Sequence, residues 1–479
     1  MRYVASLLLL WPLGCLYAPA PAHSADALAL THVTVIDGTG AAARPDQTAL
    51  IRSQHIDALG ASDEVAVPAG ARVVDGRGKF LIPGLWDMHV HLAVPQANKE
   101  INKRLYLPLL IANGVTGVRD MYSDMPTVNA WRAEISAGTL LGPRIVGTSE
   151  ILDGPGTRNY SVVRNRNDAS TAVARVKAAG SDFIKVYSVL PRAGYSGIVA
   201  ESKRQGLPFA GHVPVTVTVA EASDAGQRSI EHLTGMLLAV SSDEDALRKK
   251  FAPMAGADII AARYAFERIE LQGVSSYSAA KAEQLFARLV RNQTWECPTL
   301  VVLRSMAFMH DGDFSNDPRL KYMTAAARRR WSAQGDPDLD ASAQAGAIDR
   351  ALYPKRLELV GAMQHAGVGI LAGTDMTNPY VFPGFSLHDE LALLVEAGLT
   401  PMQALQTATL NPARYFGTEQ QTGTVAVGKQ ADLVLLDADP LIDIRNTQRI
   451  AAVVVAGRLL DKPQLTNMLQ MVEAVAAAR

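Results

Sequence analysis

Cysteine is nearly absent from this chain of 479 residues, which contains only Cys15 and Cys297. Loss of Cys15 with an N-terminal leader would exclude any internal disulfide, so burial alone would hold the core together. An excess of charge is also lacking, because acidic and basic residues leave a formal net charge of −1. Such a chain has no electrostatic footprint for nucleic acid or for an anionic membrane. The composition therefore favours a globular protein whose partner is a small molecule.

Long hydrophobic runs are lacking too, except for a short one at the N-terminus. Arg2 precedes the apolar run VASLLLLWPLG, and small residues follow in APAPAHSADA, which is typical of a secretory signal peptide. We predict a signal peptide over residues 1–25 with cleavage near Ser24 or Ala25, and export to the periplasm or the medium. The run is too short to predict stable membrane insertion. Lipid attachment at Cys15, suggested by PLGC, is the alternative.

Strand-like runs lie at both ends of the chain. Residues 28–80 alternate β-type runs with Gly, Pro and Asp turn signals, and a matching set occupies residues 423–460. Two half-sheets at opposite chain ends can pair into one domain, with everything between them inserted. We therefore predict a β-sandwich domain from residues 26–82 plus 421–466, and a C-terminal helix or tail over residues 467–479.

Eight apolar, β-branched runs alternate with helix-length segments between these ends. This alternation predicts an α/β fold over residues 83–420, a (β/α)8 TIM-type barrel rather than an open sheet. In such a barrel the chemistry lies at the C-terminal ends of the strands. The runs are GLWDMHVHL, GVTGVRD, RIVGTS, DFIKVYS, PFAGHV, SIEHLT, PTLVVL and GVGILAGTD.

Six polar residues lie in or at the ends of these runs. One buried His or Asp is most often satisfied by a backbone partner, but six where the strands converge favour metal binding. In the first run, His89 and His91 share one strand face because successive side chains alternate. The full set is His89, His91, Lys185, His212, His232 and Asp375.

Lys185 is the most informative member of this set. Between Ile184 and Val186 in a buried strand, an unpaired ammonium would cost several kcal/mol. Addition of CO2 to its amine would give a carbamate, an anion whose two oxygens can bridge two cations. The alternatives are an ion pair with a neighbouring acid and a neutral amine that forms a Schiff base.

These motifs resemble the amidohydrolase superfamily of metal-dependent hydrolases, over about residues 28 to 460. PGLWDMHVHL (83–92) is similar to that family's strand-one signature and GTD (373–375) to its strand-eight signature. NPA and GTVAVGKQADLVLLDADP are similar to its return into the β-sandwich. The chain most resembles the imidazolonepropionase-like and prolidase-like branch. That branch implies hydrolysis of C–N amide bonds in dipeptides (Xaa-Pro or similar) or N-acyl amino acids.

The resemblance also implies a binuclear metal centre. Zinc is the expected ion, with manganese or cobalt as replacements. A hydroxide shared by the two ions would attack the substrate carbonyl, and Asp375 would act as general acid and base. The implied ligands are His89, His91 and Asp375 for one ion, His212 and His232 for the other, and carbamylated Lys185 as the bridge.

Tyr187 lies two positions after Lys185 and so on the same strand face. Its hydroxyl could hydrogen-bond the substrate carbonyl or the tetrahedral oxyanion. Packing of its ring in the barrel mouth is the alternative interpretation.

Several weaker signals lie outside this set. Arg119 and Asp120 close the second run, where a local ion pair is favoured over substrate binding. Residues 236–292 and the segment after the seventh run are long enough to be candidates for a specificity lid. In the second segment, ARRRW (327–331) is expected to be a solvated helix face. The histidines assigned to surface or packing positions are His32, His55, His310, His365 and His388.

Other functions stay open at this point. A mononuclear deaminase of the same superfamily would carry a glutamate three residues after His212, where this chain has Val215. The same site could hydrolyse a lactone, carbamate, phosphotriester or cyclic amide. A non-catalytic binding protein is disfavoured because all six ligand positions are filled. The resemblance further suggests a homo-oligomer.

Overall fold

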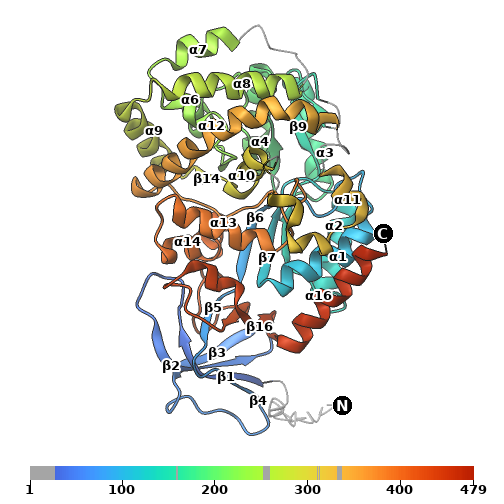
Figure 1. Ribbon diagram of the computed structural model, residues 1–479, viewed down its shortest axis with the longest axis vertical. Coiled ribbons are helices and arrows are strands. Elements are labelled where there is room, and N and C mark those ends of the chain that lie inside the picture. The colour runs from blue at the N-terminus through green and yellow to red at the C-terminus, as the bar shows by residue number, and fades with distance from the viewer. Residues whose placement is uncertain are drawn as a thin grey trace, which may run out of the picture.

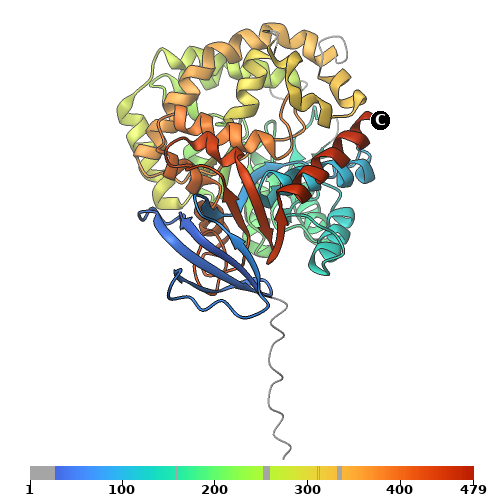
Figure 2. The same ribbon diagram turned by 60° about the horizontal axis from the view of Figure 1, so that its bottom comes forward.

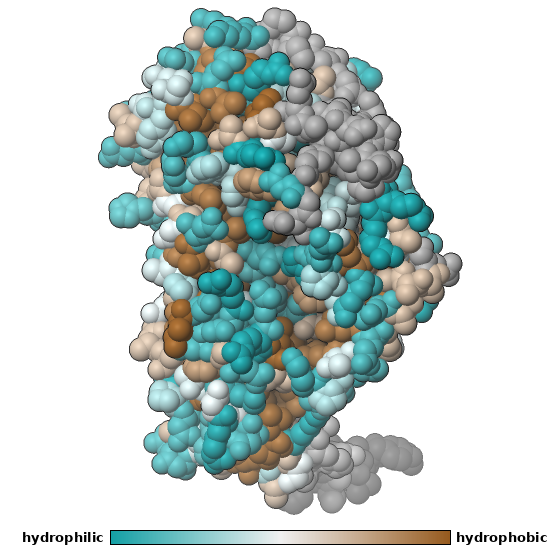
Figure 3. Space-filling model, in the orientation of Figure 1, coloured by the Kyte–Doolittle hydropathy of each residue, from teal (hydrophilic) through white to brown (hydrophobic). Residues whose placement is uncertain are grey.

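The computed structural model describes residues 27–157, 160–251, 259–309, 311, 313–331 and 337–478. The predicted signal peptide, its cleavage site, Cys15 and His310 lie outside the described residues. Among the helices that are described, none has the length and apolarity that crossing a membrane would require. On the face shown in Figure 3, apolar residues form small patches between hydrophilic ones.

The two ends of the chain form one connected eight-stranded sheet, drawn at the bottom of Figure 1. Its order is β17-β16-β15-β5-β1-β2-β3, with β4 paired to β1. The strands are β1 (Ala27–Val35), β2 (Arg44–Arg52), β3 (His55–Ala61), β4 (Arg72–Asp75), β5 (Phe80–Pro83), β15 (Leu433–Leu436), β16 (Ile450–Val455) and β17 (Arg458–Asp461).

Strands β5 and β15 join the two chain ends in this sheet. They pair antiparallel, with Ile82 opposite Val434, and Figure 2 shows the N-terminal and C-terminal strands side by side. Both ends also share one apolar cluster, in which Leu81 packs with Leu433 and Leu435. Neither half could bury these residues alone, so each end depends on the other.

Short parallel strands fill the middle of the chain. The first sheet contains β6 (Leu85–Val90), β7 (Val115–Asp120) and β8 (Arg144–Gly147). The second contains β9 (Ile151–Asp153), β10 (Ser161–Val162), β11 (Ile184–Val186), β12 (Phe209–Gly211), β13 (Ser229–Glu231) and β14 (Trp295–Cys297).

Residues 370–375 connect the last of these strands to the first. Ile370 forms a parallel bridge with Glu296 of β14. On its other side, the segment accepts a 2.8 Å hydrogen bond at the Ala372 carbonyl from the N–H of Met88 in β6. The carboxyl ends of parallel strands therefore meet along one edge, where the predicted ligands lie.

Helices follow the parallel strands. In α3 the buried residues Ala169, Ala172, Val173 and Val176 follow helical spacing, so one face packs inward. Side-chain caps start most of these helices, as Thr218 does for α5. The first five are α1 (Lys99–Ala112), α2 (Met125–Ser136), α3 (Arg166–Ala178), α4 (Arg192–Gln205) and α5 (Val219–Asp224).

The two long segments expected to form a lid contain helices of their own (Figure 1). The arginines of ARRRW lie in α11 and are exposed, as expected for a solvated face. The first segment holds α6 (Met236–Ala239), α7 (Glu244–Phe251), α8 (Ile259–Val274) and α9 (Ala279–Asn292). The second holds α10 (Leu300–Phe308), η3 (Asp313–Asn316), η4 (Pro318–Tyr322), α11 (Ala325–Arg330) and α12 (Pro337–His365).

The remaining helices connect the parallel strands to the terminal sheet. His388 of α13 is buried and contacts Thr447 of η5 (2.9 Å between Nδ1 and Oγ1), so it packs as expected. The C-terminal helix begins at Lys462, inside the range that the sequence analysis gave to the β-sandwich. These elements are α13 (Phe385–Glu396), α14 (Pro401–Thr407), α15 (Leu410–Phe416), η5 (Ile444–Gln448) and α16 (Lys462–Ala477).

Candidate metal centre

The six predicted ligand residues lie around one cavity of about 620 Å³. His89 is in β6 and Lys185 is in β11. His91, His212 and His232 directly follow strands, and Asp375 ends the segment 370–375. Tyr187 lines the same cavity. The structure thus brings together side chains that are far apart in the sequence. Lys185 and His89 are 96 residues apart, and His89 and Asp375 are 286 residues apart.

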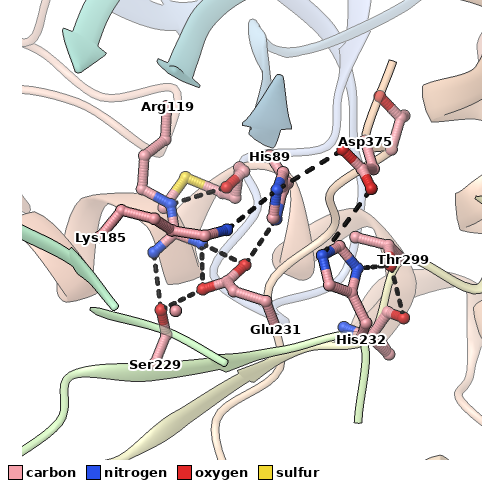
Figure 4. Close-up of polar contacts among 12 residues, drawn as sticks. His89, Arg119, Lys185, Ser229, Glu231, His232, Thr299 and Asp375 are labelled. Atoms are coloured by element: carbon pink, nitrogen blue, oxygen red, sulfur yellow. Dashed lines mark hydrogen bonds and ion pairs between the residues drawn. The ribbon is translucent and has the colours of Figure 1, made fainter. Parts of the chain in front are cut away.

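Asp375 lies between the histidines of the two proposed ion sites (Figure 4). Its Oδ1 is 3.1 Å from His91 Nε2 and 3.6 Å from His89 Nε2. Its Oδ2 is 3.7 Å from His232 Nε2. Ligands about 2.1 Å from a tetrahedral ion lie about 3.4 Å from each other, so these spacings suit an ion held by His89, His91 and Asp375.

The backbone at two of these residues is strained. Asp375 and His232 have φ values of 59° and 60°, in the left-handed region that non-glycine residues seldom adopt. Backbone hydrogen bonds hold them there: the Asp375 N–H donates to the His89 carbonyl and the His232 N–H to the Cys297 carbonyl. Strain of this kind is typical of functional sites.

Lys185 is buried without a counter-ion. Its side chain is 1% exposed, and its Nζ lies 3.4 Å from His89 Nε2. Among the described residues it has no carboxylate partner within ion-pair distance. The alternative interpretation, an ion pair with a neighbouring acid, is therefore not what the structure shows. Burial lowers the pKa of Lys185 to about 8, against the opposing charges of Glu231 and Asp375.

Each of three histidines has an oxygen beside its Nδ1. Glu231 Oε2 lies 2.8 Å from His89, Ser188 Oγ 2.8 Å from His212, and Thr299 Oγ1 2.6 Å from His232. Such partners orient the ring and leave Nε2 as the ligand atom. The Nε2 of His212 is buried with no hydrogen-bond partner among the described residues, as a ligand atom awaiting a cation would be.

Burial keeps these imidazoles neutral, which is the form that binds metals. It lowers the pKa of His89 and His212 well below the usual value and that of His232 to about 4. Burial raises the pKa of Asp375, but the hydrogen bond from His91 and the charge of Lys185 lower it to about 2. At neutral pH the site therefore presents neutral imidazoles and a carboxylate.

Arg119 corrects one expectation from the sequence. The local ion pair with Asp120 is wrong, because Arg119 pairs instead with Glu231, at 2.8 and 2.9 Å from its two oxygens. It also donates to the Met88 carbonyl (2.6 Å) and the Ser229 hydroxyl (2.7 Å). Adjacent residues of a strand point to opposite faces, so the side chains of Arg119 and Asp120 point away from each other.

Glu231, Ser188 and Thr299 are site residues that the sequence analysis missed. Glu231 is completely buried and holds His89 by accepting from its Nδ1–H while Arg119 compensates its charge (Figure 4). The acid directly before His232 in SIEHLT was the available signal. Ser188 and Thr299 carry no signal of this kind, because their roles depend on contacts made across strands.

Tyr187 is partly buried and faces the cavity. Its ring packs on His212, with centroids 3.9 Å apart, and meets the Tyr160 ring edge to face with centroids 5.1 Å apart. Burial raises the pKa of Tyr187 well above its usual value, so its phenol stays protonated and able to donate.

Comparison with known proteins agrees with this geometry. Residues 80–460 match the model of the amidohydrolase family. The chain therefore belongs to the amidohydrolase family and is a hydrolytic enzyme that acts on carbon–nitrogen bonds.

Individual relatives share a low sequence identity with this chain or match only a short part of it. A dihydroorotase from Pelotomaculum thermopropionicum is 27% identical over 387 residues, which cover 78% of this chain and 80% of the relative. An adenine deaminase from Methanothrix thermoacetophila is 39% identical, but only over 15% of this chain and 12% of that protein. A crystal structure of a Xaa-Pro dipeptidase with bound methionine superposes with a TM-score of 0.66 at 19% identity, covering 91% of this chain and all of the other. At that identity the likeness establishes a shared mixed α/β fold.

Proposed function

We propose that the protein is a binuclear metal-dependent hydrolase that cleaves amide bonds in dipeptides, such as Xaa-Pro, or in N-acyl amino acids. The observation that carries this proposal is the buried Lys185, which lies beside His89 and has no acidic partner among the described residues. A mononuclear site has no use for such a residue, whereas a carbamate formed on it can bridge two cations.

The donor set fits two divalent ions. His89, His91 and Asp375 would hold one, since their donor atoms lie within 4.8 Å of one another. His212 and His232 would hold the second, with ring centroids 5.0 Å apart. The mixture of imidazole and carboxylate favours zinc.

Carbamylation would begin with loss of a proton from the Lys185 ammonium; the neutral amine nitrogen would then join the carbon of CO2 and release a second proton. The lowered pKa of Lys185 leaves roughly a tenth of the amine neutral at pH 7, which is the form that reacts. The product replaces a buried, unpaired ammonium by an anion next to cations, which removes the desolvation problem.

The chain's own residues would move the protons of the reaction. When bound, the two cations supply a hydroxide nucleophile near neutral pH and polarise the substrate carbonyl. Asp375 would accept a proton and pass it to the departing amine, because it lies between His91 and His232. Tyr187 would donate a hydrogen bond to the carbonyl oxygen from the cavity wall.

Deamination is the competing function, since adenine deaminases are among the relatives. The glutamate that the deaminase pattern places three residues after the strand-five histidine is absent, and Val215 stands there. Lactones, carbamates, phosphotriesters and cyclic amides are electrophiles that the same site could take.

The architecture that supports this site is also proposed. We propose that the parallel strands and residues 370–375 close a (β/α)8 barrel over residues 83–420, with the β-sandwich domain built from residues 26–82 and 421–461, since α16 begins at Lys462. The protein would be exported after cleavage near residue 25. N-terminal sequencing of the secreted form would test the cleavage site.

The substrate is tested by a screen of the zinc-loaded enzyme against dipeptides and N-acyl amino acids, with the released amino acids, proline included, separated and quantified by chromatography as the readout. Assays for ammonia release from adenine and for lactone hydrolysis run in parallel. Cleavage of amides without ammonia release supports the proposal. Ammonia release without amide cleavage contradicts it.

A further inference from the structure

The cavity is also lined by a cluster of charged residues that the proposed reaction does not use, of which Glu270, Asp349 and Arg356 are buried and Arg263 is exposed. Glu267 and Glu270 of α8 line the cavity together with Arg263, and Asp349 and Arg356 of α12 line it from the neighbouring helix. Arg263, Glu267 and Glu270 are spaced so that they share one face of α8.

The basic members of this cluster already have partners. Arg356 donates to Asp349 at 2.9 Å, and the Arg263 Nε donates to Glu267 Oε1 at 3.1 Å. Arg248 of α7, the other guanidinium that acts on Glu270, donates to Glu244 at 2.9 Å and does not line the cavity.

Two acidic oxygens are left over. Glu270 is 4% exposed, and its Oε1 has no hydrogen-bond partner in the part of the chain that the structure describes. The Oε2 of Glu267 is likewise buried and has no hydrogen-bond partner among the described residues. An unpaired buried acceptor is destabilising, so a hydrogen-bond donor from a ligand would be favoured there.

The surroundings suit an amphipathic ligand group. Phe266 of α8 and Val302, Leu303 and Met306 of α10 line the same cavity and offer apolar contacts to a hydrocarbon stem. A side chain with an apolar stem and a charged tip could pack its stem here and place its tip at the carboxylates.

We propose that Glu270, assisted by Glu267, forms a subsite for a cationic nitrogen of the substrate, an ammonium or guanidinium group. The subsite determines specificity within the proposed hydrolase and rests on that function. Burial raises the pKa of Glu270 to about 7, which agrees with a carboxyl that needs a cation beside it to ionise fully. The cation could belong to a basic side chain or to the free amino terminus of a dipeptide, and N-acyl amino acids without a basic side chain would lack it.

Matched substrates separate these sources. Dipeptides that differ only in lysine against norleucine test the side chain, and the same dipeptides with and without N-acetylation test the amino terminus. We expect the Glu270→Gln variant to lose about tenfold to a hundredfold in kcat/KM for the cationic member of one pair and to leave the neutral member unchanged. Glu267→Gln should show a smaller loss of the same kind. Glu283→Gln, an exposed residue on α9, is the matched control and should change neither.

Binding of pentylammonium, with pentanol as the neutral probe, tests the subsite without turnover. Calorimetry on the zinc-loaded protein should show pentylammonium binding about tenfold weaker to Glu270→Gln than to the wild type, and pentanol binding unchanged. Equal losses for cationic and neutral substrates, or unchanged pentylammonium binding, would overturn the subsite. If no substrate is cleaved while pentylammonium binding still depends on Glu270, the proposed function fails and the subsite stands.

Discussion

Arg119 and Glu231 form an ion pair that is completely buried, with the guanidinium 2.8 and 2.9 Å from the two carboxylate oxygens. The same carboxylate accepts from Nδ1–H of His89, which directs His89 Nε2 toward Asp375. A pair of side chains outside the ligand set thus fixes the orientation of a ligand.

Replacement of Glu231 should therefore weaken both the fold and the metal site. Glu231→Gln leaves Arg119 buried without its counter-charge, and we expect a loss of about 3–5 kcal/mol in the free energy of unfolding. Zinc affinity should fall about tenfold to a hundredfold, as for other partners of metal-bound histidines. Denaturant unfolding and zinc titration measure the two effects.

The control is Glu134→Gln, at a half-exposed ion pair with Lys103. For this variant we expect the free energy of unfolding to fall by less than about 1 kcal/mol and zinc affinity to stay unchanged. Equal behaviour of the two variants would show that Glu231 does not position His89.

Tyr187 should contribute to turnover and not to metal binding. Tyr187 lines the cavity while its ring packs on His212, so Tyr187→Phe keeps the ring and removes the hydroxyl. We expect kcat to fall about a hundredfold to a thousandfold with unchanged zinc content, as for the loss of one oxyanion donor. An unchanged kcat with intact zinc would exclude Tyr187 from the reaction.

Asp375 should be required for both metal retention and proton transfer. Asp375→Asn keeps the shape of the side chain but removes the charge that faces His91 and His232. We expect activity to fall at least about a hundredfold and zinc content to drop, measured by assay and elemental analysis. Asp437→Asn, at a surface ion pair with Lys79, is the control and should match the wild type. Full activity in Asp375→Asn would remove it from the mechanism.

The buried carboxyl of Glu390 should make the stability of the fold depend on pH. It is buried on α13, accepts from the Val301 N–H at 2.7 Å, and burial raises its pKa to about 8. The folded state therefore binds more protons than the unfolded state between about pH 4.5 and pH 8, and its contribution to stability declines as the pH rises through this range.

Glu390→Gln removes this titration. Denaturant unfolding at several pH values should show that the variant gains stability relative to the wild type as the pH rises toward 8. A constant difference between the two proteins from pH 5 to pH 8 would contradict the raised pKa.

Much of this site follows from strand alternation and run ends. Alternation places His89 and His91 on one face, and the position of Lys185 between two apolar residues marks it as buried, which its 1% exposure matches. The pairing of β5 with β15 was also predictable, because each chain end carried half of an apolar sheet.

The rest depends on long-range contacts that a sequence does not specify. Glu231 meets His89 across 142 residues, and Arg119 meets Glu231 across 112. Local proximity suggested Asp120 as the partner of Arg119, although alternation in the strand argues against it. Residues 236–292 were expected to influence specificity, but only the structure shows that Glu267 and Glu270 of α8 line the cavity.

Metal and carbamate analysis of the wild type and Lys185→Ala gives the most direct test of a binuclear centre. Each protein is reconstituted with zinc and bicarbonate, and bound zinc is counted while 13C-labelled carbamate is sought by NMR. We predict about two zinc ions per chain and a carbamate signal in the wild type, with loss of the signal, of the second ion and of activity in Lys185→Ala. A wild type without bound zinc, or a Lys185→Ala variant that keeps both ions and full activity, would contradict this proposal.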